Sequence, residues 1–78
     1  MSMPITSSQC RGARAMLNWT QRELAKAAGV AVNTIRNFET GAHTPHESNR
    51  RKIRAALEAG GIEFLDRGNG GPGARLRG

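Results

Sequence analysis

Residues 20–41 read T-Q-R-E-L-A-K-A-A-G-V-A-V-N-T-I-R-N-F-E-T-G, a pattern that predicts two short helices joined by a tight turn. Thr20 is a good N-cap for the first helix, because Glu23 stands three residues later and can bond back to the backbone N–H of the cap. Gly29 suits the left-handed residue that ends such a helix. The second helix follows at once, and Gly41 can end it.

Each of these two helices has one apolar side. The inward positions are Leu24, Ala25 and Ala28 in the first helix and Ile35 and Phe38 in the second. Trp19 with Leu24, and Val30 with Ile35, have the spacing of hydrophobic staples. The outward side chains of the second helix are mostly groups that hydrogen-bond base edges or phosphates: Val32, Asn33, Thr34, Arg36 and Asn37.

The pattern of helix, tight turn and helix resembles the phage repressor and Cro family of DNA-binding domains, also called the XRE family. The residues that carry the resemblance are Gln21, Leu24, Ala25, Gly29, Val30, Ile35, Glu39 and Gly41, together with Arg14 upstream. It covers about residues 6–60. The spacing by itself gives two helices and a turn, and DNA recognition is what the resemblance and the charge add.

The resemblance implies which residues touch DNA. Phosphate contacts fall at the start of the first helix and in the loop after the second, at Thr20, Gln21, Arg22 and His43. Base readout falls to Val32, Asn33, Thr34, Arg36 and Asn37. Asn33 or Asn37 suits adenine and Arg36 suits guanine. Val32 suits a thymine methyl group, and Thr34 suits either a base or a phosphate.

Two positions beside the recognition helix also follow from the resemblance. In the family, an arginine at the position of Arg14 commonly pairs with the glutamate that is here Glu39. The alternative is two unrelated surface charges. At Ala31 the family usually has Ser or Thr, whose hydroxyl caps the helix and can touch a phosphate. Alanine does neither, which costs about 1 kcal/mol.

A helix is expected before this pair. It starts at Thr6, where Gln9 completes a capping box and Ile5 faces Cys10 as a staple, and it ends at Asn18. Its inner face consists of Cys10, Ala13, Met16 and Leu17.

A fourth helix is expected over residues 45–59. Thr44 is its N-cap, Pro45 takes the first position and Glu47 the third. Its inward residues are Ile53, Ala56 and Leu57. It also carries a basic run, which is either a solvated face or a set of phosphate contacts: Asn49, Arg50, Arg51, Lys52 and Arg54.

After Gly61 the apolar period changes from helical to alternating. The tail, residues 62–78, is predicted to form a β-hairpin around the glycine-rich turn R-G-N-G-G-P-G. A phosphate loop fits poorly, because no Lys-Ser/Thr and no helix follow the glycines. The hairpin either packs on the helices or pairs with that of a second copy, and we expect dimerisation through Ile62, Phe64, Ala74 and Leu76. The alternative is a fraying tail that adds only charge.

Composition agrees with a polyanionic partner. Lys and Arg outnumber Asp and Glu by 12 to 6 among 78 residues, although such an excess also serves plain solubility. Cys10 is the only cysteine, so an intrachain disulfide and a zinc cluster are excluded and a reducing cytoplasm fits. The N-terminus does not read as a signal peptide, and no apolar run reaches a membrane span. His43 and His46 are three apart with no clustered carboxylate or thiol, so no metal is expected.

The sequence thus predicts a mainly α protein: a four- to five-helix, repressor-like helix-turn-helix domain over residues 1–61 with a C-terminal hairpin over residues 62–78. The function expected is a cytoplasmic transcriptional regulator that binds double-stranded DNA as a homodimer. The alternative is an antitoxin-type module that binds a protein partner, such as a toxin, as well as DNA. No nucleophile–base pair or carboxylate dyad suggests an enzyme, and no cofactor is expected.

Overall fold

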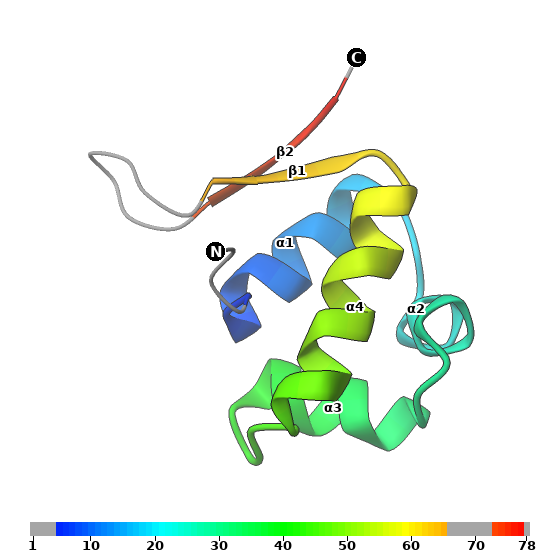
Figure 1. The fold of residues 1–78 in the computed structure, drawn as a ribbon, viewed down its shortest axis with the longest axis vertical. Helices are drawn as coiled ribbons and strands as arrows, with labels where there is room; N and C mark the ends of the chain where they lie inside the picture. The colour runs from blue at the N-terminus through cyan, green and yellow to red at the C-terminus, as the bar shows by residue number, and fades with distance from the viewer. Residues whose placement is uncertain (1–4, 66–72, 78) are drawn as a thin grey trace.

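The computed structural model describes residues 5–65 and 73–77. Its elements are α1 (Ser7–Met16), α2 (Gln21–Ala28), α3 (Val32–Thr40), α4 (Glu47–Ala59), β1 (Ile62–Leu65) and β2 (Gly73–Leu76) (Figure 1). The prediction of a mainly helical chain with a C-terminal hairpin is confirmed. No helix in these two ranges has both the length and the apolar character needed to cross a bilayer.

The capping residues fix the start of the first two helices. Thr6 accepts a hydrogen bond from the Gln9 N–H at 3.1 Å, and the Gln9 side chain accepts one from the Thr6 N–H at 2.9 Å. Thr20 and Glu23 make the same reciprocal pair at 3.0 and 2.8 Å. Each pair satisfies two backbone donors that the first turn of a helix leaves free. Both predicted capping boxes are therefore present.

The turn between α2 and α3 depends on Gly29. Its φ of 72° lies in the left-handed region, which glycine adopts without the steric cost of a Cβ. The Val30 N–H then donates to the Ala25 carbonyl at 3.0 Å, which closes the end of α2. This turn lets α3 pack directly against α2, while α4 packs on α2 and α1 packs on α3.

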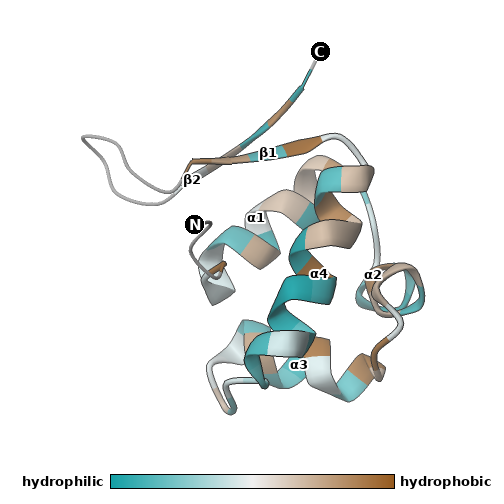
Figure 2. Cartoon of the chain, in the orientation of Figure 1, coloured by the Kyte–Doolittle hydropathy of each residue, from teal (hydrophilic) through white to brown (hydrophobic). Residues whose placement is uncertain are grey.

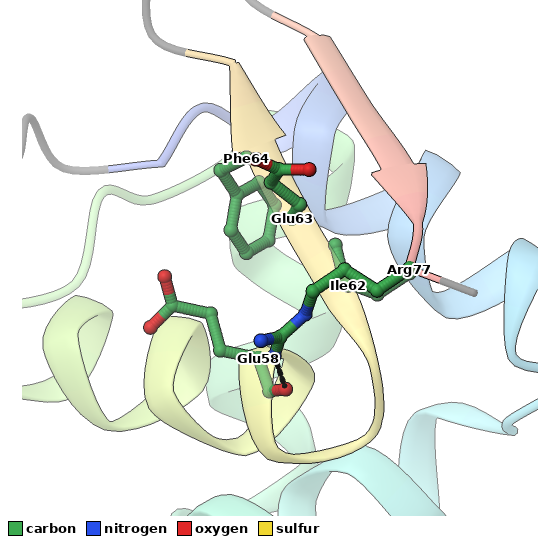
Figure 3. A pocket seen from close by; sticks show the side chains of 5 residues that line it. All are labelled: Glu58, Ile62, Glu63, Phe64 and Arg77. Carbon is green, nitrogen blue, oxygen red and sulfur yellow. Dashed lines mark hydrogen bonds between the residues drawn. The ribbon is translucent and has the colours of Figure 1, made fainter.

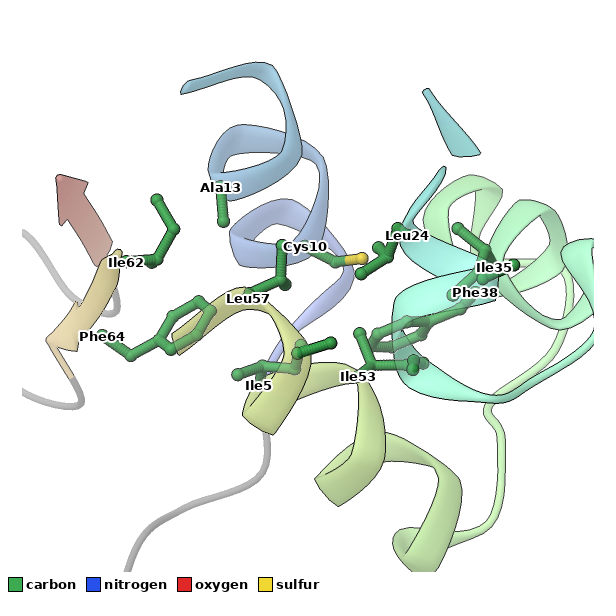
Figure 4. Packing of buried hydrophobic residues seen from close by; sticks show 13 residues of the cluster. Ile5, Cys10, Ala13, Leu24, Ile35, Phe38, Ile53, Leu57, Ile62 and Phe64 are labelled. Carbon is green, nitrogen blue, oxygen red and sulfur yellow. The ribbon is translucent and has the colours of Figure 1, made fainter. Parts of the chain in front are cut away.

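One hydrophobic cluster joins all the elements (Figure 4). The predicted inner residues of α2, α3 and α4 are buried, with Leu24, Ile35 and Leu57 wholly excluded from solvent. In α1, Cys10 and Ala13 are buried as predicted, but the side chain of Met16 is 38% exposed. Helix α1 ends at Met16, and Asn18 then adopts a left-handed φ of 57°, as its predicted place at the helix end requires. Leu17 turns inward instead and packs on the cluster.

Helix α4 begins at Glu47, two residues later than predicted. His46 is its N-cap, and Thr44 and Pro45 lie in extended loop outside it. The φ of proline is compatible with extended backbone as well as with a first helical turn, so sequence alone does not distinguish the two starts. Pro45 is buried, which ties the loop to the domain.

The hairpin packs on the helices. Strands β1 and β2 are antiparallel, with Ile62 opposite Leu76 and Phe64 opposite Ala74. Strand β1 packs on α4 and β2 on α1. Ile62 and Phe64 are buried in the common core, so of the two arrangements expected for the hairpin it packs on the helices, and its part in a dimer stays a prediction. Ala74 packs partly against the core, whereas Leu76 is 51% exposed. Apart from Gly73, which begins β2, the glycine-rich turn lies outside the described residues.

Candidate nucleic-acid interface

A buried ion pair fastens α1 to the end of α3. The Glu39 side chain is 3% exposed, and Arg14 binds its carboxylate with two nitrogens along one edge of the guanidinium. Arg14 Nε lies 2.9 Å from Oε2, and Arg14 Nη2 lies 2.9 Å from Oε1. The remaining nitrogen donates to the Trp19 carbonyl at 2.9 Å. Such a planar, two-point contact fixes orientation as well as distance.

Three other residues contact Glu39. Gln21 Nε2 donates to Oε1 at 3.1 Å, the Cys10 thiol donates to Oε2 at 3.4 Å, and Arg11 donates to the Glu39 backbone carbonyl. Burial alone raises the pKa of the Glu39 carboxyl, but hydrogen bonds from Arg14, Gln21 and Cys10 outweigh it and hold the pKa below its ordinary range. Glu39 is therefore ionised at neutral pH.

Two of these partners have roles that the sequence did not indicate. Burial, and then the charge of Glu39, raise the pKa of the Cys10 thiol, so it stays protonated and serves as a donor. Gln21, predicted to bind phosphate, is half-buried and directs its amide at Glu39. Its hydrogen bond joins the start of α2 to the end of α3.

The outer face of α3 presents polar side chains. Asn33, Arg36 and Asn37 are exposed, whereas Thr34 and Val32 are half-buried, and Val32 packs partly on the core. Arg36 donates to Asn33 Oδ1 at 2.8 Å. The two side chains are therefore held together one helical turn apart, and their planar groups are both exposed.

The predicted phosphate contacts lie at the start of α2 and in the loop after α3. Thr20 and Arg22 are exposed at the start of α2, where the Thr20 oxygen is already the acceptor of the cap. His43 is exposed in the loop after α3, and its backbone N–H donates to the Asn37 carbonyl at 3.2 Å. This bond attaches the loop to the last turns of α3.

The loop also brings residues to α3 that sequence reasoning did not assign to it. A pocket of about 210 Å³ is lined by Asn33, Thr34, Asn37, His43, Pro45, His46 and Asn49. His46 and Asn49 are the additions. No spacing rule could have found them, because the path of an extended loop decides which part of α4 meets α3.

Two of the arginines in the basic run of α4 form ion pairs with glutamates of the same helix. Arg51 pairs with Glu47 and Arg54 pairs with Glu58, each at 3.1 Å, and Arg54 also lies over the Phe64 ring. Within the described residues, Arg50 Nε is buried without a hydrogen-bond partner. Figure 2 shows the N-terminal half of α4 as hydrophilic, but these pairs reduce the positive charge that the helix can offer a phosphate.

A second pocket lies at the hairpin, away from α3 (Figure 3). It measures about 350 Å³ and is lined by Glu58, Ile62, Glu63, Phe64 and Arg77. The charged residues of this pocket already have partners. Arg77 donates to the Glu58 backbone carbonyl at 2.8 Å, and Glu63 pairs with Arg75 at 2.7 Å. Three or more potential metal ligands gather nowhere among residues 5–65 and 73–77.

The start of α3 lacks a side-chain cap. Ala31 is the N-cap residue with extended backbone, and no side-chain hydrogen bond reaches the first turn. We expect Ala31→Ser to raise the free energy of unfolding by about 1 kcal/mol, because its hydroxyl would accept a bond from a free backbone N–H. Chemical denaturation followed by circular dichroism measures this. Ala42→Ser, exposed in the loop, is the control, and an equal gain there would contradict capping as the cause.

One comparison with known proteins, that with protein-family models, agrees with this geometry. A comparison with proteins of curated function finds no match to this chain. The model of the family described as "Helix-turn-helix" matches residues 11–63, which is more than half of the chain and includes α2, the turn at Gly29 and α3. On the match and the arrangement of its helices, this chain belongs to the Cro-like, XRE-type helix-turn-helix family of DNA-binding proteins.

Proposed function

We propose that the protein is a sequence-specific transcriptional regulator that acts in the cytoplasm as a homodimer on double-stranded DNA with two-fold symmetry. The observation that carries this proposal is the division of α3 into two faces. Ile35 and Phe38 anchor it in the core, while Asn33, Arg36 and Asn37 are exposed along the other side. A helix held rigidly in this way suits the major groove.

In this proposal, phosphate contacts and base contacts are made by different residues. Thr20, Arg22 and His43 bind phosphates and set the register, and Gln21 does so with whatever part of its amide Glu39 leaves free. Bases are read by the side chains of Val32, Asn33, Thr34, Arg36 and Asn37. The clamp between Arg14 and Glu39 supports this by fixing the last turn of α3 against α1.

Substitutions on α3 test the readout. We expect Asn33→Ala and Arg36→Ala each to weaken specific binding by about 1–3 kcal/mol per half-site and to relax one base preference. The two effects should be less than additive, because the side chains bond to each other at 2.8 Å. Selection from a random duplex pool followed by fluorescence anisotropy measures both quantities.

Lys52→Ala provides the matched control, because it removes an exposed cation from α4. Its effect should be the same on selected and unselected duplexes. If the α3 variants bind the selected duplex as the parent does, another surface reads the bases.

The second part of the proposal is that β2 joins two copies. The Arg77 N–H donates to the Gly61 carbonyl at 2.7 Å, so by the alternation of an antiparallel ladder the backbone groups of Ala74 and Leu76 face the outer edge. An edge of this kind can pair with its own copy across a two-fold axis. Leu76 adds an apolar side chain that is half exposed.

We expect Leu76→Asp to yield a monomer in sedimentation velocity, with unchanged helical circular dichroism and much weaker operator binding. Truncation after Gly61 is a poorer test, because it would also remove Ile62 and Phe64 from the core. Ala55→Asp is the comparison variant, as Ala55 is exposed on α4. If Ala55→Asp yields a monomer and Leu76→Asp does not, the interface is on α4 and the hairpin has no part in it.

A further inference from the structure

The pocket between α3 and the start of α4 contains both histidines of the chain. His43 and His46 line it together with Asn33 and Asn37 from the exposed face of α3 and Asn49 from α4. Both histidines are exposed, and neither side chain has a hydrogen bond or ion pair among the described residues. They are therefore available to a ligand that enters the pocket.

The chemistry of the lining suits an anion. Amide groups, a threonine hydroxyl and two imidazoles can all donate hydrogen bonds, and no carboxylate is among the seven lining residues. An imidazole donates from both nitrogens, and carries a charge, only when it is protonated. The pocket therefore offers neutral donors at high pH and two additional positive charges at low pH.

The charged groups around the histidines are few and mostly paired. On α3, Arg36 donates to Asn33. On α4, Glu47 follows His46 and is paired with Arg51 at 3.1 Å. Arg50 lines a neighbouring pocket that His43 also borders. The carboxylate next to His46 is therefore neutralised by its own partner, and Arg36 and Arg50 add to the attraction for an anion.

The position of the pocket favours DNA as the source of the anion. Three of its lining residues, Asn33, Thr34 and Asn37, belong to the face of α3 that we propose for base readout. A helix seated in the major groove has the phosphate backbone directly beside it. We propose that this pocket binds a DNA phosphate and that His43 and His46, when protonated, give the pocket positive charge. DNA affinity therefore rises as the pH falls. This inference rests on the proposed function.

The direction of this pH dependence follows from the coupling between proton binding and DNA binding. The protonated imidazoles bind the phosphate more tightly than the neutral ones, so complex formation takes up protons, to a limit of two per protomer. The measurement therefore covers about pH 8 to pH 5.5, the range in which histidine side chains in general change charge. A phosphate that raises the proton affinity of one imidazole by about one pH unit increases the association constant about tenfold across that range.

The test compares the parent with His43→Gln, His46→Gln and the double variant. Each binds a duplex selected at pH 8, at constant ionic strength, in anisotropy titrations from pH 8 to 5.5. We expect the parent affinity to rise about tenfold for each histidine that reaches the phosphate. The double variant should lose this rise, so that its affinity is the same at pH 8 and pH 5.5. Asn33→Ala, which removes no titrating group, should keep the rise while binding more weakly.

The outcomes separate the inference from the function on which it rests. A parent that binds the selected duplex with the same affinity at every pH overturns the inference and leaves the function standing. The same is true if the double variant retains the pH dependence, since other groups would then be responsible. A parent that binds no duplex preferentially at any pH overturns both. Circular dichroism at each pH confirms that the glutamine variants remain folded.

Discussion

Arg14→Ala should lower the free energy of unfolding by about 3–5 kcal/mol, because it leaves the Glu39 carboxylate buried without its cation. Glu39 is 3% exposed, and two of the bonds to its oxygens come from Arg14 at 2.9 Å. A domain of this size has only about 5–15 kcal/mol of stability, so the variant should melt at a much lower temperature. Urea denaturation gives the value directly.

The control for this experiment is Arg51→Ala. Arg51 and Glu47 form an ion pair of similar length, 3.1 Å, but their side chains are 73% and 60% exposed. Solvent screens such a pair, and its removal should cost about 0–1 kcal/mol. The double change Arg14→Ala/Glu39→Ala should cost less than the sum of the single changes. Additive single effects would show that the clamp has no energetic coupling.

The clamp also predicts a dependence of stability on pH. The folded state holds the pKa of Glu39 below its ordinary value, and the unfolded chain does not. The stabilisation is therefore complete above the unfolded-state pKa of about 4.3, and it is lost as the pH falls through the folded value. Parent and Glu39→Gln should converge in stability in acid, and an unchanged difference from pH 7 to pH 3 would contradict the assignment.

DNA binding should fall steeply with salt. A homodimer that neutralises about 6–10 phosphates should lose about 10³–10⁵ in affinity between about 50 and 200 mM salt, because bound cations are released from the DNA. The formal net charge of +6 per chain at pH 7 is the source of this attraction. Titrations at four salt concentrations give the slope, and Arg22→Ala should reduce it by about one for each phosphate that is no longer neutralised.

A nearly flat salt dependence would contradict phosphate binding as the main source of affinity. It would favour the antitoxin-type alternative, in which a protein partner supplies the principal contact. Copurification of the tagged chain with one defined protein would then be the direct observation to seek.

The sequence determined the local structure of this protein. Capping pairs such as Thr20 with Glu23, and the apolar spacing of α2 and α3, are effects within a few residues of chain, so they can be seen without tertiary contacts. The alternation in residues 62–65 likewise predicted a strand. The start of α4 was predicted two residues too early, because proline permits both of the conformations in question.

Only the tertiary structure decided which side chains of different elements contact one another. Ile62 and Phe64 were expected at an interface between copies and are buried in the protomer's own core, because the hairpin lies within reach of α1 and α4. Gln21 contacts Glu39, 18 residues away along the chain, because α2 packs directly on α3. His46 and Asn49 join the pocket beside α3 because the loop after α3 is attached to that helix by the bond from the His43 N–H to the Asn37 carbonyl. Contacts over such sequence separations depend on three-dimensional packing, which periodicity does not encode.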